Sequence, residues 1–511
     1  MAGLKRIFVV GLLIVSSYAL STCVNPLLDT VRIMVEESTD PLRVTYQPAP
    51  GTYTTPQSVQ LSASKASAVI RYTTDDSEPT ATNGTLYAGA FDVGASTTIR
   101  ARAFLDPYSP SEVAVGAFTI PFGGQTKKTA LTLESGAEFG WAVAIDGDYA
   151  IVGAPYEDGA GSNRGAAYIF HRTGPDTWDT GIKIIATNPT DEHAFGFSVD
   201  IDGDYAIVGT QNWLGRTSAY IYHRTGPDNA WDGGVKIDTT SPQDYGYFGD
   251  AVAINGDYAA VGAFGEDGNN TDSGAAYIFH RTGTNAWSAP QKVIGFDSLS
   301  NDAFGHTLSI AGDYVIVGAP WYNSIGPSPL SDVGTAYIFH RTGTNSWEAG
   351  DKLLAGGTTE AGAEFGCSVD ISGDYGIIGA QNEDVTAISQ AGAAYTIHRI
   401  GTNSWEIGSR ITASDPQTMD YFGSSVAISG DYAIGAAKME DEVADRAGAI
   451  YSFHRTAVNT WDADPVAKWT AFDGGEREFF GCAVSLDGMY AIAGAWGYPK
   501  DVNYGAAYIL H

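Results

Sequence analysis

The chain consists mostly of short segments in which apolar and polar residues alternate, and Gly, Pro, Asp and Ser mark turns between them. Val59 and Leu61 alternate with polar neighbours in one early segment, and Ile99 and Ala101 do so in another. A period of two residues is typical of half-buried β-strands. Residues 44–120 are therefore predicted to form a small antiparallel β-sandwich.

From residue 126 onward the chain repeats one longer pattern, and such a repeat predicts the architecture. Each repeat begins with Phe-Gly and continues with an alternating strand, a turn that reads Gly-Asp-Tyr in the first six repeats, and an apolar strand. A loop of variable length follows, then a third strand that ends near a histidine and a fourth strand that begins with Trp. Four short strands joined by hairpins form one blade of a β-propeller. The Phe-Gly pairs begin at Phe139, Phe195, Phe248, Phe304, Phe365, Phe422 and Phe480.

The two ends of the repeat region predict how the ring of blades closes. The seventh repeat stops at His511, after its third strand, so its fourth strand is missing. Residues 127–139 match residues 352–365 in kind and nearly in length. We therefore expect residues 126–137 to pair with the last strand, which removes exposed sheet edges. The predicted fold class is all-β, with a seven-bladed β-propeller over residues 121–511 after the small β-sandwich.

Two repeats carry a fuller signature, Phe139-Gly140 with Val152-Gly153-Ala154-Pro155 and Phe304-Gly305 with Val317-Gly318-Ala319-Pro320. These residues resemble the FG-GAP repeats of integrin-type β-propellers and their bacterial relatives. The resemblance implies a surface protein that binds a protein or a glycan. Integrin-type repeats often carry Asp-x-Asp-x-Asp-Gly calcium loops, whereas residues 156–159 and 265–268 lack those alternating oxygen ligands. We therefore expect no cofactor and no metal site, and calcium is the open alternative.

The sandwich segment is also specific. Pro50-Gly51-Thr52-Tyr53, Ile70-Arg71-Tyr72-Thr73-Thr74-Asp75 and Ile99-Arg100-Ala101-Arg102-Ala103 look like the chitobiase/β-hexosaminidase C-terminal module. That module is an immunoglobulin-like accessory domain, and the resemblance implies no catalytic residue. A spacer role is predicted, with weak sugar binding as the alternative.

The N-terminus has the features of an export signal. Lys5 and Arg6 precede an apolar run, residues 7–20, that is short for a membrane span. The run ends at Leu20-Ser21-Thr22-Cys23, which resembles a bacterial lipobox. Residues 1–22 are thus predicted to be a lipoprotein signal peptide, Cys23 the lipidation site and residues 23–43 a tether, with an ordinary secretory signal as the alternative. The expected location is the bacterial cell envelope, lipid-anchored at the outer membrane or cell surface.

Composition narrows the class of partner. The 511 residues carry 28 Lys and Arg against 59 Asp and Glu, a formal net charge of −31. This acidity argues against nucleic acid or anionic lipid as the main partner. No Gly-x-Ser-x-Gly elbow, His-Glu-x-x-His motif or phosphate-binding loop occurs. We expect a monomer that is not an enzyme, whose partners are an extracellular protein or glycan and, through its lipid anchor, the membrane.

Residues that invite a catalytic interpretation recur from blade to blade. A catalytic base is needed once, near one substrate, whereas a position filled in each blade serves each blade. The third-strand histidines and the aspartates of the Gly-Asp-Tyr turns are therefore predicted to be structural, and Cys367 and Cys482 to be small buried residues. The histidines are His171, His223, His280, His340, His398, His454 and His511.

Topology predicts which face of the propeller binds. The loops between second and third strands share one face with the connections between blades, and both vary among repeats; the opposite turns are nearly constant. Variable loops on a rigid scaffold usually carry binding. These loops contain Glu-Asp pairs at residues 157–158, 266–267, 383–384 and 440–441. The candidate ligand-binding residues are aromatic: Trp321, Tyr322, Trp213, Trp496 and Tyr156.

Two other functions remain open from the sequence. One is a carbohydrate-active hydrolase or lyase on a propeller scaffold, and the other is a purely structural envelope protein. An unpaired carboxylate cluster at the central channel would favour the enzyme, whereas similar linings in all seven blades would count against it. Fold alone does not choose among these functions.

Overall fold

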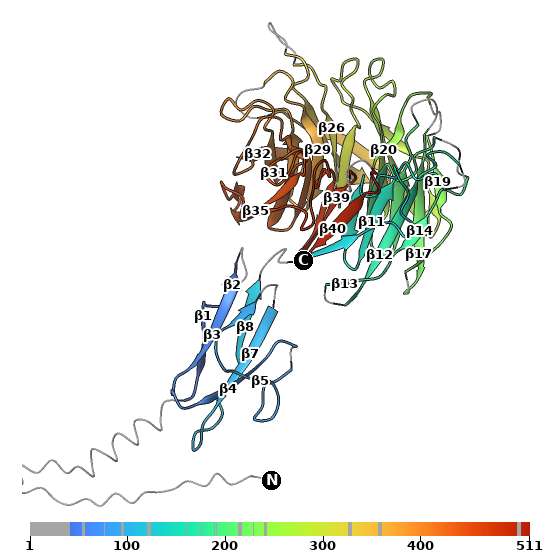
Figure 1. Ribbon diagram of the computed structural model, residues 1–511. Coiled ribbons are helices and arrows are strands. Elements are labelled where there is room, and N and C mark those ends of the chain that lie inside the picture. Colours follow the sequence, from blue (N-terminus) through green and yellow to red (C-terminus); the bar gives the residue numbers. More distant parts are fainter. Residues whose placement is uncertain are drawn as a thin grey trace, which may run out of the picture. The chain divides into compact units, whose positions relative to one another are not determined.

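The computed structural model describes residues 41–511, apart from residues 54–56, 76, 94–96, 120–123, 160, 175, 189, 191, 213–216, 228, 240–242, 325–329, 356–359 and 498–501. The predicted signal peptide, Cys23 and most of the predicted tether lie outside the described residues. Every regular element of the described part is a β-strand, and no helix there is long and apolar enough to cross a membrane. The chain divides into two compact units, with the change at Phe118 (Figure 1).

The first unit is a β-sandwich, as predicted. Its alternating pattern explains its core, because Val59, Leu61 and Ile99 are buried while the residues between them along each strand are exposed or half-buried. The hydroxyl of Tyr46 donates to the carbonyl of Ile99 at 2.9 Å and so joins the two sheets. The strand orders are β1 (Val44–Gln47), β3 (Gln57–Ala63), β6 (Phe91–Val93) and β2 (Gly51–Thr52), β8 (Ala114–Thr119), β7 (Thr97–Phe104), β4 (Val69–Thr73), β5 (Thr85–Leu86).

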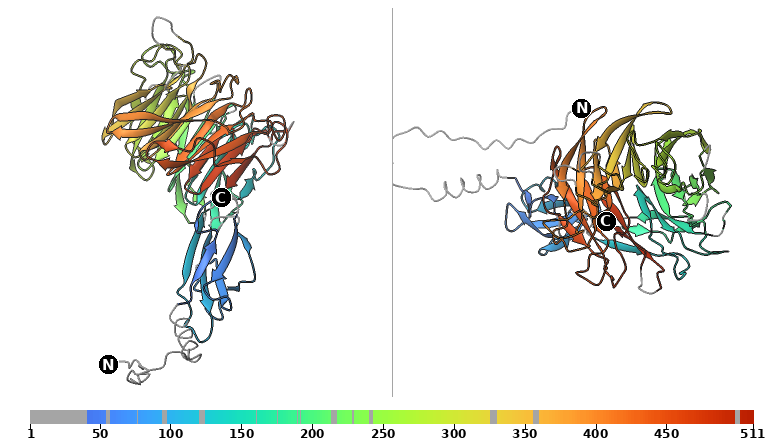
Figure 2. Two further views of the ribbon diagram at one scale, coloured as in Figure 1. Left: turned by 90° about the vertical axis from the view of Figure 1, so that its left-hand side faces the viewer. Right: turned by 90° about the horizontal axis from the view of Figure 1, so that it is seen from above.

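The second unit is a seven-bladed β-propeller, as predicted (Figures 1 and 2). The innermost strands of blades one to seven are β10 (Val143–Asp146), β15 (Ser198–Asp202), β20 (Phe248–Asn255), β25 (Thr307–Ala311), β29 (Phe365–Ser372), β33 (Phe422–Ser429) and β38 (Val484–Asp487). The second strands are β11 (Tyr149–Ala154), β16 (Tyr205–Gly209), β21 (Tyr258–Ala263), β26 (Tyr314–Ala319), β30 (Tyr375–Ala380), β34 (Tyr432–Ala437) and β39 (Tyr490–Ala495).

The third and outer strands complete each blade. The third strands are β12 (Ala166–Gly174), β17 (Ala219–Gly226), β22 (Ala275–Gly283), β27 (Thr335–Gly343), β31 (Ala393–Gly401), β35 (Ala449–Ala457) and β40 (Ala506–Leu510). The outer strands, some of them in two pieces, are β13 (Thr177–Trp178) with β14 (Ile182–Ile184), β18 (Ala230–Trp231) with β19 (Val235–Ile237), β23 (Ala286–Trp287) with β24 (Gln291–Val293), β28 (Ser346–Leu353), β32 (Ser404–Ile411), β36 (Thr460–Trp461) with β37 (Ala467–Trp469), and β9 (Gln125–Lys128).

The repeated sequence motifs have clear structural roles. Gly147 in the first Gly-Asp-Tyr turn has a φ of 54°, a left-handed conformation that glycine adopts without steric cost. Gly153 permits close packing of blades, because a Cβ there would lie 1.9 Å from the carbonyl oxygen of Gly196. The phenylalanine of Phe-Gly fills the blade core: Phe139 is fully buried, with its ring centroid 5.4 Å from that of Tyr168.

The first strand of the propeller sequence, β9, closes the ring, as the unequal ends of the repeat region predict. Strand β9 pairs antiparallel with β40, Lys128 opposite Ala507 and Gln125 opposite Leu510. The pairing covers residues 125–128, whereas the rest of the predicted stretch contains no strand. Each innermost strand contacts the next around the ring, and β38 contacts β10. The seventh blade is therefore built from both ends of the propeller sequence.

Candidate functional site

The face formed by the Gly-Asp-Tyr turns, here called the turn face, is occupied by ion pairs between strands. In six blades an arginine at the end of the third strand pairs with the turn aspartate of its own blade and lies over a tyrosine of the preceding blade, 4.0 to 5.2 Å from the ring centroid. The pairs are Arg172–Asp148, Arg224–Asp204, Arg281–Asp257, Arg341–Asp313, Arg399–Asp374 and Arg455–Asp431.

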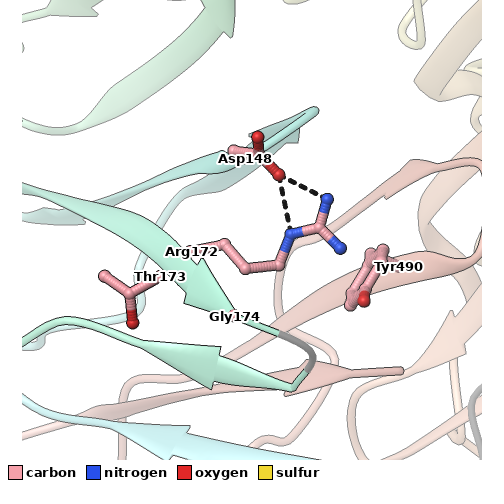
Figure 3. Close-up of a pocket in the computed structure, with 5 residues that line it drawn as sticks. All are labelled: Asp148, Arg172, Thr173, Gly174 and Tyr490. Atoms are coloured by element: carbon pink, nitrogen blue, oxygen red, sulfur yellow. Dashed lines mark hydrogen bonds and ion pairs between the residues drawn. The ribbon is translucent and has the colours of Figure 1, made fainter. Parts of the chain in front are cut away.

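Figure 3 shows one of these units, beside an open pocket of about 430 Å³ between the seventh and first blades. The Nε of Arg172 donates to Asp148 at 2.8 Å, and its guanidinium lies 4.4 Å from the Tyr490 ring centroid. Because equivalent units recur around the ring, we interpret the unit as a joint between blades.

The repeated histidines on the same face also make internal contacts. Each lies near the tyrosine of the second strand in its own blade, with ring centroids 4.6 to 5.1 Å apart in the first six blades and 6.4 Å apart in the seventh. Tyr149 and His171, for example, are direct partners in the β11–β12 register. These contacts agree with the structural role predicted for the histidines.

The glutamates of the four Glu-Asp pairs point into the blades on the opposite face, here called the loop face. Glu157, Glu266, Glu383 and Glu440 are all buried. In the fifth blade the hydroxyl of Tyr395 donates to Glu383 at 2.8 Å, and Arg410 pairs with the same carboxylate at 2.7 Å. These glutamates are therefore not open to a ligand, and they neutralise cations from the outer strands.

The sixth blade has the most charged of these arrangements, here called the Lys468 cluster. The ammonium of Lys468 donates to Asp415 at 2.6 Å, to Glu440 at 2.9 Å and to Glu442 at 2.5 Å. The side chain of Glu440 is completely buried. The carboxylate oxygens of this trio lie within 4.8 Å of one another, close enough to share a metal ion. In this structure the lysine ammonium lies among them instead.

The five predicted aromatic residues have different environments. Trp321 is 38% exposed, and Tyr156 and Trp496 are half-buried. Tyr322 is only 4% exposed, and Lys352 lies 3.5 Å from its ring centroid. The prediction that Tyr322 offers its ring to a ligand is therefore corrected, because that ring is packed inside the fourth blade. Trp213 lies outside the described residues.

Three of these aromatic residues belong to a larger group around the inner edge of the loop face. Trp141 contacts Tyr156 of its own blade and both neighbouring blades, at 5.3 Å from Phe197 and 5.9 Å from Trp496. Phe264 contacts Trp321 in the next blade at 6.0 Å. We call this group the aromatic arc; its members are Trp141, Tyr156, Phe197, Tyr247, Phe264, His306, Trp321, Phe479 and Trp496.

Polar residues occupy the rest of this inner edge, in the fifth and sixth blades. Gln381 donates to Glu364 at 2.7 Å and accepts from Lys438 at 3.2 Å. We call Glu364, Gln381, Ser424 and Lys438 the polar arc. Asp250 follows Phe-Gly in the third blade, as Trp141 does in the first, and it accepts a 3.4 Å hydrogen bond from Gln211. An apolar surface and a hydrogen-bonding surface thus share the inner edge.

The family comparisons agree with this architecture. Residues 48–115 match the chitobiase/beta-hexosaminidase C-terminal domain. Seven segments match the FG-GAP repeat, at residues 122–170, 178–222, 236–279, 287–339, 347–397, 405–453 and 464–510. The chain belongs to the FG-GAP repeat family. A search of curated proteins found no match to the chain. Both family resemblances seen in the sequence are confirmed.

Two carboxylates on innermost strands of the FG-GAP propeller bear on the enzyme alternative. Asp200 accepts a hydrogen bond from the Ile254 N–H at 2.7 Å, and burial raises the pKa of Asp200 to about 8. Asp370 accepts from the Ile428 N–H at 2.8 Å, and burial raises its pKa to about 6. Each carboxylate therefore joins its blade to the next one, and the charge of Asp370 also acts to raise the pKa of Asp200.

Exposed apolar side chains are unevenly divided between the two faces of the FG-GAP propeller. Ile400, near the end of β31, and Val458, in the turn after β35, lie on the turn face. Many more lie in the loops between second and third strands or in the connections between blades, and thus on the loop face: Leu131, Leu133, Ile185, Tyr245, Phe296, Leu299, Trp321, Leu354, Met419, Val443 and Phe472. Such an accumulation on one face is typical of an interaction surface.

Proposed function

We propose that this FG-GAP protein is exported, anchored by lipid to the bacterial cell envelope, and binds an extracellular ligand through the loop face of its propeller. The observation that carries the proposal is the contrast between the faces. Aromatic and apolar side chains are accessible on the loop face, whereas on the turn face the arginines form ion pairs with the turn aspartates and the histidines lie against tyrosines. In this proposal the sandwich acts as a spacer and the propeller works as a monomer without a catalytic role.

The proposed anchor predicts a specific effect of Cys23→Ala. The wild-type protein should sediment with membranes, and the variant should be found in the soluble fraction or remain unprocessed. A single acyl chain holds a protein only marginally, so stable retention requires several chains on this cysteine. The measurement is fractionation followed by N-terminal mass spectrometry. Soluble wild-type protein with a mature N-terminus elsewhere would contradict lipidation.

The proposed binding face predicts opposite effects for two substitutions. On arrays of glycans and extracellular proteins, Trp321→Ala should weaken binding to the captured ligand by about tenfold or more, with little change in melting temperature, because its ring is partly exposed. His280→Ala should lower the melting temperature by removing the ring against Tyr258 and should leave affinity unchanged. Ile400→Ala, exposed on the turn face, is the control that changes neither.

A loss of binding in folded His280→Ala, with Trp321→Ala unaffected, would move the binding site to the turn face. Retention of all array binding after both substitutions would place it outside the propeller faces described above. Either result would contradict the proposed function.

A further inference from the structure

The inner edge of the loop face has hydrogen-bond acceptors that protein groups leave unused. The acceptors are Oε2 of Glu138 and Oε1 of Gln211, which are shielded from solvent and have no hydrogen-bond partner among the described residues. Nδ1 of His306 is also shielded and unpartnered there, and its tautomer decides whether it accepts or donates. Gln211 as a whole is 3% exposed, and its amide nitrogen is directed to Asp250. Because an unsatisfied buried acceptor is costly, this edge suits a ligand that brings several donors.

These acceptors lie next to the aromatic arc. Glu138 precedes the Phe-Gly pair that leads to Trp141, and its charge is close enough to influence Tyr156. His306 lies 5.5 Å from Phe264 and 5.8 Å from Trp321 between ring centroids. A ligand at this edge therefore meets half-buried aromatic rings and acceptor atoms together.

The charges of this edge favour a neutral ligand. Burial, together with the nearby charge of Lys438, lowers the pKa of His306 to about 4, so the His306 imidazole is uncharged at neutral pH. Lys438 belongs to the polar arc and is partly exposed. Burial raises the pKa of Glu138 to about 7, and it raises that of Asp250 to about 7 against the hydrogen bond from Gln211. Lys438 is hydrogen-bonded to Gln381, and burial keeps Glu138 and Asp250 more protonated than ordinary carboxylates, so this edge offers little charge to a strong anion or a strong cation.

We propose that the inner edge of the loop face binds a neutral oligosaccharide, with pyranose rings stacked on the aromatic arc and hydroxyls of the oligosaccharide donating to Glu138, Gln211 and Asp250. A pyranose combines a flat C–H face with several hydroxyl donors, which is the combination that this edge complements. A protein side chain that entered the same edge would bring fewer donors. This inference rests on the proposed function and specifies the ligand of the same face.

The test is titration of the full-length protein in detergent with cellohexaose, chitohexaose, mannohexaose and xylohexaose, by calorimetry and tryptophan fluorescence. At least one hexasaccharide should bind. Trp141→Ala and Gln211→Ala should each weaken that binding by about tenfold or more, while Trp141→Phe, which keeps an aromatic face, retains most of it. Phe472→Ala is the matched control, because this ring is 64% exposed on the loop face outside the aromatic arc.

The inference is overturned if a bound hexasaccharide binds equally well to folded Trp141→Ala and Gln211→Ala. It is also overturned if no hexasaccharide binds or competes with an array ligand. In that second case, a protein ligand whose capture depends on Trp321 leaves the proposed function intact, whereas the absence of any ligand dependent on the loop face contradicts both.

Discussion

Lys468→Met is expected to lower the free energy of unfolding by about 3–5 kcal/mol at neutral pH. The ammonium of Lys468 lies between Asp415 and Glu440, at 2.6 and 2.9 Å. The side chain of Glu440 is completely shielded from water, so removal of the cation leaves a buried carboxylate without its counter-charge. Methionine keeps most of the aliphatic length of lysine, so the loss reports on charge more than on packing. Thermal and chemical melts measure the effect.

The pH dependence of this loss has a defined sign. Burial acts to raise the pKa of Asp415, but hydrogen bonds from Lys468 and Tyr451 outweigh it, so this pKa is lowered. A carboxyl group whose pKa is lower in the folded state than in the unfolded state stabilises the fold at every pH above the unfolded-state pKa. That stabilisation is lost as the pH falls through the folded-state pKa. Without Lys468 the carboxylates bind protons more readily. Acidification therefore removes the unpaired negative charge that destabilises the variant. We therefore expect the stability difference between wild type and Lys468→Met to narrow from pH 7 toward pH 4.

Lys236→Met is the matched control for Lys468→Met. Lys236 pairs with Asp238 at 3.3 Å, but its side chain is 49% exposed, and such surface pairs contribute only about 0–1 kcal/mol. Calcium should raise the melting temperature of Lys468→Met more than that of the wild type, because the freed carboxylate oxygens lie within 4.8 Å of one another. Equal melting of wild type and Lys468→Met at pH 7 would show that the lysine does not hold the cluster together.

The fold was predictable because its signals repeat. Phe139 and its equivalents lie at the start of each innermost strand or three to four residues before it, and the turn glycines such as Gly147 mark the next hairpin. Ring closure was predictable from the missing strand after His511 and the surplus strand before Phe139. Because every blade carries the same signals, an ambiguous signal in one blade changes the predicted architecture little.

The candidate site was predictable only in part, because loop variability hides a constant geometry. Tyr322 occupies the position that glutamate occupies in other blades, such as Glu157 and Glu383, the third residue after the second strand. That position faces the cation of the outer strand, so its side chain is buried whatever the loop length. Aligning the repeats on the end of the second strand would have revealed this.

Residues at the inner edge were missed for a related reason. Trp141, Phe197 and His306 directly follow Phe-Gly, where the pattern indicates only the beginning of a strand. In the structure this position contacts neighbouring blades around the inner edge. The available signal is that the residue after the invariant Phe-Gly changes in chemical type from blade to blade, whereas most strand positions do not.

Replacement of residues 125–128 by alternating glycine and serine is expected to cost about 4 kcal/mol or more of stability and to promote aggregation. Strand β9 covers the edge of β40, whose Tyr508, Ile509 and Leu510 are fully buried. Without that strand the seventh blade exposes a free edge that other chains can pair with. Light scattering and thermal melts measure both effects.

Strand β9 also joins the neighbouring blades through its side chains. Lys128 donates to the carbonyl of Trp178 in the first blade at 3.0 Å, and Gln125 donates to that of Thr470 in the connection between the sixth and seventh blades at 2.9 Å. A synthetic peptide of residues 124–131 should therefore rebind the substituted protein and raise its melting temperature in a concentration-dependent manner. A scrambled peptide should have no effect. If the substituted protein melts like the wild type, or both peptides act alike, the ring does not depend on β9 for its closure.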